Sequence, residues 1–314
     1  MYVNKNCKLS FQVFRSLMLS LKLNASYKNT RGYKIFMKHS FLLVGQSNMA
    51  GRGFLKEVPI ICNEHINVMR NGRWQIMMEP INYDRSYAGI GLSGSFAAAW
   101  CKKNKSKEIG LIPCAENGAS LDDWSQDGPL FKHAIFQAQL AKQSSNLDGI
   151  LWHQGENECF SGLYKLYHKK FSKIVSAFRR ELNDPDIPVI LGGIGDYLGN
   201  GSFGQYFPEH SEVNQALLDF SKKEKNCYFV TASGLTANPD GIHFNAVSQR
   251  IFGMRYFEAY HQRKHIFEPL KGEENAINID SDRPLTTNEK NTILEKQFIE
   301  GTISFEEYQA QLMK

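Results

Sequence analysis

The first residue that could carry out chemistry is Ser47, which lies in the stretch FLLVGQSNMAGRG at residues 41–53. A buried strand that runs into a glycine-flanked turn is how α/β proteins present a ligand-binding or nucleophilic group at the carboxyl edge of a sheet. The spacing is not that of the G-x-S-x-G elbow, because the second glycine is Gly51. A serine in such a turn is also a common helix N-cap, and only a neighbouring base would make it a nucleophile.

The candidate for that base is His243, one of nine histidines in the chain. It lies in the stretch NPDGIHFN, residues 238–245, between the last predicted strand and the last predicted helix. A proline and a glycine flank Asp240 and favour a tight turn there. A carboxylate three residues before the imidazole can then reach Nδ1 and leave Nε2 free, which are the two roles needed beside a nucleophilic serine. Asp-x-x-His is a weak pattern alone, but its place at the carboxyl edge of the same sheet strengthens it.

A nucleophilic serine that attacks a carbonyl also needs hydrogen-bond donors for the oxyanion of its transition state, and two further strand ends offer them. The stretch AENGAS at residues 115–120 contains Gly118, whose backbone N–H can approach a ligand closely. The stretch WHQGE at residues 152–156 places the side-chain amide of Gln154 at another strand end. The sequence therefore provides donors on two loops at the edge where Ser47 is expected.

A metal site in the same region is the alternative to this assignment. The possible ligands are His153, Glu156, Glu158 and Cys159. Their spacing matches no zinc pattern, and we expect neither a metal nor an organic cofactor.

The elements that must position these residues alternate between short apolar runs and longer amphipathic segments. Continuous apolar runs are typical of strands buried on both faces of a parallel sheet, and they are residues 41–44, 109–114, 149–152, 188–191 and 227–230. Helices are predicted at residues 93–102, 130–143, 161–183, 208–223 and 244–260. This alternation predicts an α/β fold of three α/β/α layers around a flavodoxin-like, five-stranded parallel sheet.

Two segments do not fit this alternation of strands and helices. Residues 54–90 carry an Asn-Gly turn and several aromatic residues. An insertion of this length after the first strand usually carries a function or forms a lid. The polar tail ends in two short predicted helices joined at Gly301. The predicted domains are a basic leader at 1–36, an α/β domain that holds the site at 37–265, a linker at 266–291 and a helical hairpin at 292–314.

Charge separates the N-terminal segment from the rest of the chain. Residues 1–40 contain eight Lys and Arg and no Asp or Glu, so the other residues carry −3 of the formal net charge of +5. The body is therefore not expected to bind nucleic acid, and no apolar run approaches the roughly 18 residues of a membrane span. The leader is either an interrupted signal peptide or a segment before a natural start at Met37, and we favour the second. The six cysteines include no C-x-x-C pair, which suggests reduced thiols and a cytoplasmic protein.

Four motifs in one order resemble those of the SGNH hydrolases, in the branch of sialate O-acetylesterases and acetylxylan esterases. They are GQSNMAG, ENGAS with the later Trp124, WHQGE and DGIHFN, between about residues 41 and 260. The resemblance implies that Ser47 is the nucleophile of a triad completed by Asp240 and His243, with Gly118, Gln154 and the Ser47 N–H in the oxyanion hole. Two residues differ from the usual family pattern, Asn117 in place of glycine and Ala119 where threonine is often found.

The implied function is a serine esterase that removes O-acetyl groups from a carbohydrate through an acyl-serine intermediate. We expect Glu156 to support the site from behind, and Asn48, Trp74 and Trp124 to contact substrate, with the aromatic residues of 54–90 as a wall for sugar stacking. One alternative is a non-catalytic carbohydrate-binding protein, which would have no need of the complete serine, aspartate and histidine set. A second is a flavodoxin-like nucleotide binder, but GQSNMAG lacks the glycine spacing of a phosphate-binding loop.

The tail shows a further, weaker resemblance to the short C-terminal helical motif called SHOCT. It rests on ILEKQ at residues 293–297 and ISFEEY at 303–308. The oligomeric state and the sugar are not predicted by the sequence.

Overall fold

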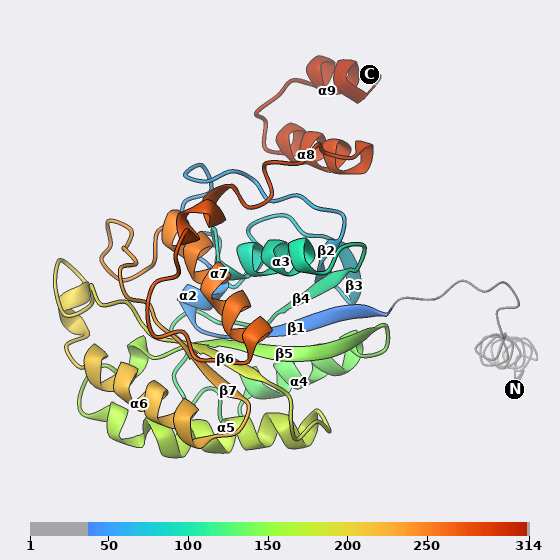
Figure 1. The fold of residues 1–314 in the computed structure, drawn as a ribbon. Coiled ribbons are helices and arrows are strands. Elements are labelled where there is room, and N and C mark those ends of the chain that lie inside the picture. The colour runs from blue at the N-terminus through green and yellow to red at the C-terminus, as the bar shows by residue number, and fades with distance from the viewer. Residues whose placement is uncertain (1–36, 313–314) are drawn as a thin grey trace, which may run out of the picture. The chain divides into compact units, whose positions relative to one another are not determined.

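The centre of the fold is a single seven-stranded sheet in the order β3-β2-β4-β1-β5-β6-β7 (Figure 1). The computed structural model describes residues 37–312, so the predictions for residues 1–36 lie outside the described residues. The strands are β1 (Lys38–Gly45), β2 (Ile66–Arg70), β3 (Arg73–Ile76), β4 (Ile109–Pro113), β5 (Ser145–His153), β6 (Val189–Gly192) and β7 (Cys227–Val230). All neighbours pair in parallel except β2 with β3, which are antiparallel at one edge.

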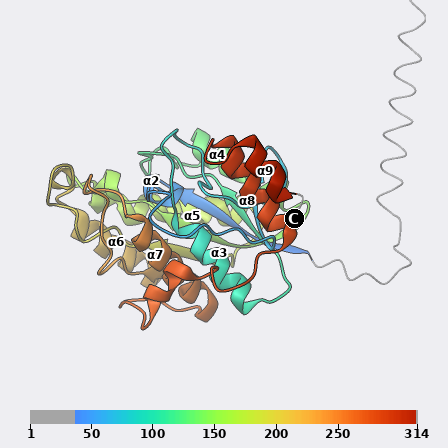
Figure 2. The same cartoon turned by 90° about the horizontal axis from the view of Figure 1, so that it is seen from above.

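Helices cover both faces of this sheet and make the three predicted layers. The helices are α2 (Ser47–Ala50), α3 (Leu92–Lys103), α4 (Pro129–Ala141), α5 (Tyr167–Glu181), α6 (His210–Lys223), α7 (Ala246–Gln262), α8 (Thr287–Ile299) and α9 (Phe305–Leu312), with short 3₁₀ turns at Glu156–Glu158, Leu163–Leu166, Gly204–Tyr206 and Glu273–Asn278. Helices α3 and α7 pack on one face and lie side by side in both views (Figures 1 and 2), whereas α4, α5 and α6 cover the other face. None of the helices within 37–312 is long and apolar enough to cross a bilayer.

The middle strand β1 shows why the strand sequences are apolar without alternation. Leu42 and Val44 belong to the core beneath α4, α5 and α6, while Phe41 and Leu43 belong to the core beneath α3 and α7. Both faces of the strand are buried, so both sets of alternating side chains must be apolar.

The predicted fold class is confirmed, but the predicted number of strands was too low. The five predicted runs form β1, β4, β5, β6 and β7, and the described part of the chain adds β2 and β3 from the segment 54–90. Asn71 and Gly72 join these two strands with φ of 49° and 72°. Two consecutive positive φ values are typical of the tight hairpin turn that Asn-Gly favours, so the hairpin could have been predicted from this dipeptide.

The C-terminal tail forms two helices as predicted, and the first begins earlier than expected. Thr286 and Glu289 form a capping box, so α8 begins at Thr287. The buried carboxylate of Glu289 also accepts the backbone N–H of Glu64 at 2.9 Å, and that of Thr286 at 2.9 Å. These bonds fasten the start of α8 to the loop before β2.

Candidate active site

Ser47 lies at the carboxyl end of β1, where the chain leaves the sheet abruptly. Gly45 has φ of +138°, and a Cβ atom there would lie 2.0 Å from the carbonyl oxygen of His153 on β5. Only glycine fits this turn, because both the backbone angle and the close approach exclude a side chain. Gln46 occupies the N-cap position, and Ser47 is the first residue of α2. The hydroxyl of Ser47 is therefore not a helix cap.

That hydroxyl faces the imidazole of His243. Ser47 Oγ lies 3.0 Å from His243 Nε2, and His243 Nδ1 lies 2.7 Å from Oδ2 of Asp240. The three residues come from the turn after β1 and the loop before α7, which are almost two hundred positions apart in the sequence but meet at one edge of the sheet. The three side chains thus form one continuous chain of hydrogen bonds, in the order expected of a nucleophile, a base and an orienting carboxylate.

The turn that carries Asp240 and His243 fixes the charge of the carboxylate. Oδ1 of Asp240 accepts the backbone N–H groups of Ile242 at 2.9 Å and His243 at 3.0 Å. Partial burial raises the pKa of Asp240, but the bonds from the imidazole and these N–H groups outweigh it and lower the pKa to about 2. Asp240 is therefore ionised at neutral pH, which keeps the proton of the imidazole on Nδ1 and leaves Nε2 free to accept one.

Asn48 links the two halves of this arrangement. Its side-chain nitrogen donates to Glu156 at 2.5 Å and to the carbonyl of Ile242 at 3.3 Å, and its side-chain oxygen accepts the N–H of Phe244 at 3.0 Å. Asn48 is buried and all of its amide is used inside the protein, so the expectation of a substrate contact is corrected to a bridge between α2 and the His243 loop.

Glu156 accepts a hydrogen bond from Asn48 and so holds its side chain in place. It is buried, and its Oε1 lies 3.5 Å from His153 Nε2 in addition to its bond with Asn48. Burial raises the pKa of Glu156, but the contacts with His153 and Asn48 outweigh that effect and hold the pKa below its ordinary value. Glu156 thus contacts Asn48, which bonds to the backbone on either side of His243, and its predicted role behind the site stays a prediction.

Gly118 lies in the loop after β4 with φ of +68°, and a Cβ atom there would meet nothing within 4 Å. The backbone N–H groups of Gly118 and Ser47 donate to no acceptor within residues 37–312. The loop is held from both sides, since Asn157 donates to the carbonyl of Gly118 and Arg52 donates to Oδ1 of Asn117 at 3.0 Å. The departure from the family pattern at Asn117 thus supplies an anchor for this loop.

Gln154 is completely buried and reaches the same loop. Its Nε2 donates to the carboxylate of Glu158 and to the carbonyl of Ala119 at 3.3 Å, while its Oε1 lies 3.1 Å from the hydroxyl of Tyr167. These partners fix which side of the amide faces the loop. One N–H is held by the carboxylate of Glu158, and the other makes the longer bond to the carbonyl of Ala119.

Glu158 was considered from sequence only as a possible metal ligand. The structure gives it a different environment, because its carboxylate accepts both Gln154 and the backbone N–H of Leu121, at 2.8 Å. Burial raises the pKa of Glu158 to about 7, and the hydrogen bonds offset only part of that rise. Glu158 therefore connects the loop after β4 with the loop after β5.

The two tryptophans predicted to contact substrate do not reach the site. Trp124 is fully buried beneath the turn of Ser47 and donates to the carbonyl of Gly45 at 3.2 Å. Trp74 is on β3 and donates to Ser144, at the amino end of β5. The backbone of Trp74 pairs with Met69 of β2, but its indole extends toward Lys38 and Ser144, at the amino ends of β1 and β5 and away from Ser47. Both expected substrate contacts were wrong, because the sequence does not show in which direction each indole points.

Other residues of the segment 54–90 do reach the site. A cavity of about 360 Å³ is lined by His243 and Asp240 together with Phe54, Leu55 and Tyr87, and about half or more of the surface of Phe54 and Tyr87 is exposed. The guanidinium of Arg52 lies 5.1 Å from the centre of the Tyr87 ring. The wall of this cavity is aromatic, as expected of the segment, but the residues that form it are not those singled out from the sequence.

Comparison with known proteins now bears on this site. A family model described as "Carbohydrate esterase, sialic acid-specific acetylesterase" matches residues 37–262, well over half of the chain. The chain belongs to this family. The carbohydrate esterase is accordingly a carboxylic ester hydrolase with an acylated carbohydrate as substrate, and the predicted resemblance is confirmed.

Individual relatives agree in fold. The esterase is 28% identical over 244 residues to a protein of Arabidopsis thaliana named as a probable carbohydrate esterase, covering 70% of this chain and 89% of that one. The crystal structure of an Arabidopsis thaliana protein is 26% identical with a TM-score of 0.66, over 72% of this chain and 98% of that one. The crystal structure of NanS has a TM-score of 0.60 at 18% identity, over 74% of this chain and 98% of that one, and shows the shared fold alone.

Proposed function

We propose that the esterase hydrolyses O-acetyl esters of carbohydrates through an acetyl-serine intermediate on Ser47. The observation that carries the proposal is the chain of contacts from Ser47 Oγ through the imidazole of His243 to Asp240, at 3.0 and 2.7 Å. A serine hydroxyl beside an imidazole that is oriented by an ionised carboxylate is activated for attack on an ester carbonyl.

In the first half-reaction Ser47 Oγ bonds to the acetyl carbon while its proton passes to His243 Nε2. The negative charge on the carbonyl oxygen is stabilised by the free N–H groups of Ser47 and Gly118 and by one N–H of Gln154. The bond to the sugar oxygen then breaks, and the proton on His243 goes to that oxygen. The cavity beside Tyr87 and Phe54 accommodates the departing sugar.

In the second half-reaction a water molecule attacks the acetyl-serine. His243 takes the proton of the water, the same donors stabilise the second tetrahedral intermediate, and the proton returns to Ser47 Oγ as acetate leaves. Asp240 remains a carboxylate throughout and stabilises the imidazolium. The chain's own residues account for every proton transfer in this scheme.

A serine-directed phosphonate tests the nucleophile directly. We expect one stoichiometric adduct on Ser47 by peptide mass spectrometry, and none in Ser47→Ala. The His243→Ala variant should label far more slowly, and Ser281→Ala, which changes an exposed serine just before α8, should label like wild type. Each triad variant should lose on the order of 10⁴-fold or more in kcat for acetyl esters, and the losses should not add in the double variant.

The same measurements separate the proposal from a non-catalytic carbohydrate-binding protein. Such a protein would bind saccharides but form no phosphonate adduct and release no acetate. A panel of O-acetylated sialic acid, O-acetylated xylo-oligosaccharides, and aryl esters of acetate and butyrate would define the sugar and the acyl chain. Retention of a tenth of the wild-type kcat by Ser47→Ala would disprove the mechanism.

A further inference from the structure

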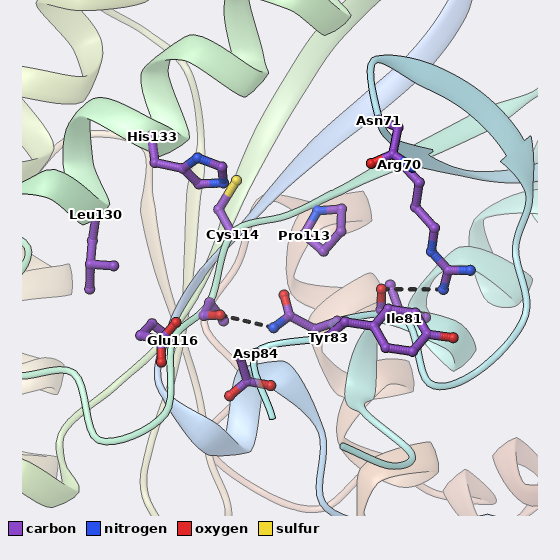
Figure 3. Close-up of a pocket in the computed structure, with 12 residues that line it drawn as sticks. Arg70, Asn71, Ile81, Tyr83, Asp84, Pro113, Cys114, Glu116, Leu130 and His133 are labelled. Atoms are coloured by element: carbon purple, nitrogen blue, oxygen red, sulfur yellow. Dashed lines mark hydrogen bonds between the residues drawn. The ribbon is translucent and has the colours of Figure 1, made fainter. Parts of the chain in front are cut away.

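A second cavity, of about 420 Å³, adjoins the candidate active site at the end of β4 (Figure 3). Its floor is formed by Pro113 and Cys114, with His133, Leu130 and Glu116 on one side and Arg70 and Tyr83 on the other. Asp84 also lines this cavity, and its buried ion-pair partner Arg52 lines the cavity beside His243. The two cavities therefore meet at one ion pair.

Tyr83 gives this cavity an aromatic surface that is held in place. About two thirds of the residue is exposed, and the guanidinium of Arg70 lies 4.6 Å from the ring centre. Arg70 is fixed in turn because it donates to the carbonyl oxygens of Met78 at 3.2 Å and Pro80 at 2.7 Å. An exposed ring with one supported face is suited to packing against the C–H face of a pyranose, which is attracted to the negative face of the ring.

The charges around the cavity favour an uncharged ligand. Two carboxylates line it, Asp84 and Glu116, against the one guanidinium of Arg70. Asp84 is neutralised by Arg52, and Glu116 pairs with Arg85 at 2.6 Å. The guanidinium of Arg70 is held in turn by the carbonyl oxygens of Met78 and Pro80, so a ligand carboxylate would have to displace an internal partner of one of these arginines. Sugar hydroxyls can add hydrogen bonds to Glu116 without that cost.

We propose that this cavity is a saccharide subsite that holds a neutral pyranose unit attached to the acetylated one. The inference rests on the proposed function for the register of the sugar, since Glu116 lies two residues before Gly118 in the same loop. A chain with its acetyl group at Ser47 could extend past the Arg52–Asp84 pair onto Tyr83. The esterase then acts on neutral acetylated oligosaccharides in preference to sialic acid.

Binding and turnover of xylotriose probes test this subsite separately. Titration calorimetry with unacetylated xylotriose measures the cavity without catalysis, and kinetics compare O-acetylated xylotriose with 4-nitrophenyl acetate, which carries no sugar unit. In Tyr83→Ala we expect the Kd of xylotriose and the KM of its acetylated form to rise about tenfold, the change produced by losing about 1.4 kcal/mol of binding. The kcat/KM for 4-nitrophenyl acetate should stay within twofold.

Two variants serve as controls. Tyr83→Phe keeps the ring and should bind xylotriose within threefold of wild type, and Tyr206→Ala removes an equally exposed tyrosine outside the cavity and should change nothing. N-acetylneuraminic acid should not displace xylotriose.

Xylotriose binding unchanged in Tyr83→Ala would overturn the subsite, as would an equal loss with 4-nitrophenyl acetate, because that would indicate a distorted loop. Displacement by the sialic acid would overturn its preference for neutral sugars. Failure of the proposed function looks different, because wild type would then hydrolyse neither ester while the calorimetric result still reports on the cavity.

Discussion

The guanidinium of Arg52 donates to the side-chain oxygen of Asn117 over 3.0 Å, and thereby ties the turn of the nucleophile to the loop that carries Gly118. Arg52 is itself held by Asp84 at 2.5 Å, with both side chains almost fully buried. The planar, bidentate geometry of arginine makes this possible, because one group can serve a carboxylate and an amide together. The position of one predicted oxyanion donor is thus set by a residue in the loop of the nucleophile.

The first prediction removes this link alone. Asn117→Ala should leave the Arg52–Asp84 pair intact but free the loop, and we expect kcat for acetyl esters to fall roughly tenfold with little change in KM, since misplacement of a donor weakens mainly the transition state. Steady-state kinetics check this, with Asn275→Ala, an exposed asparagine in the 3₁₀ turn at 273–278, as control. An unchanged kcat would show that the loop keeps its shape without the bond.

The second prediction compares two glycines with nearly the same backbone. Gly118 and Gly301 have φ of +68° and +69°, and an added Cβ meets nothing within 4 Å at either. Alanine at either site should cost about 1–2 kcal/mol of stability through backbone strain. Only Gly118→Ala should also lower kcat, because the strain moves an N–H aimed at substrate. Equal kinetics in the two variants would argue against Gly118 as an oxyanion donor.

The third prediction concerns Gln154. Gln154→Ala should lower kcat by roughly 10²–10³ and leave KM within a few-fold, as expected of a donor that acts in the transition state. The variant also deprives the buried Glu158 of a partner, so it should be repeated in a Glu158→Gln background, where the loss of stability is smaller but the loss of kcat persists. A change confined to KM would make Gln154 a residue for ground-state binding.

The fourth prediction follows from the raised pKa of Glu158. Its ordinary value is 4.5 and its folded-state value is about 7, so between these pH values the folded protein keeps a proton that the unfolded chain releases. The free energy of unfolding therefore falls as the pH rises from 4.5 to 7, by at most on the order of 3 kcal/mol. Denaturant unfolding of wild type and Glu158→Gln between pH 5 and 8.5 should show wild type losing stability relative to the variant. A difference independent of pH would contradict it, and Glu306→Gln, an exposed glutamate of α9, should show none.

The residues that the sequence could locate are those fixed by strand ends. Ser47, Gly118, Gln154 and the Asp240–His243 turn each follow an apolar run, and parallel topology brings the carboxyl ends of such runs to one edge. The same logic predicted five strands and the helices between them. Hydrophobic patterning therefore predicts that Ser47 and His243 lie at the same edge of the sheet, where Ser47 Oγ is 3.0 Å from His243 Nε2.

Other features depended on tertiary contacts. Trp74 and Trp124 could not be placed because an aromatic residue serves equally in a core and on a binding surface, and only packing decides between them. Arg52 and Glu158 acquire their roles from partners more than 30 residues away, Asn117 and Leu121, which no local pattern indicates. The β2–β3 hairpin was missed for a different reason, since its strands, INVMR and RWQI, place polar or charged residues between the apolar ones and so lack a continuous apolar run.

The segment 54–90 has a consequence for how such enzymes diversify. It supplies Phe54, Tyr83 and Tyr87 to the two cavities, yet it contributes no member of the triad and no oxyanion donor. It is fastened to α7 through the buried pair of Glu79 with Arg250. The aromatic rings proposed to bind the sugar and the residues proposed to cleave the ester are thus encoded on different stretches of the gene. A recombination event that exchanged residues 54–90 but kept Glu79 would change which sugars the enzyme binds without changing the residues proposed to cleave the ester.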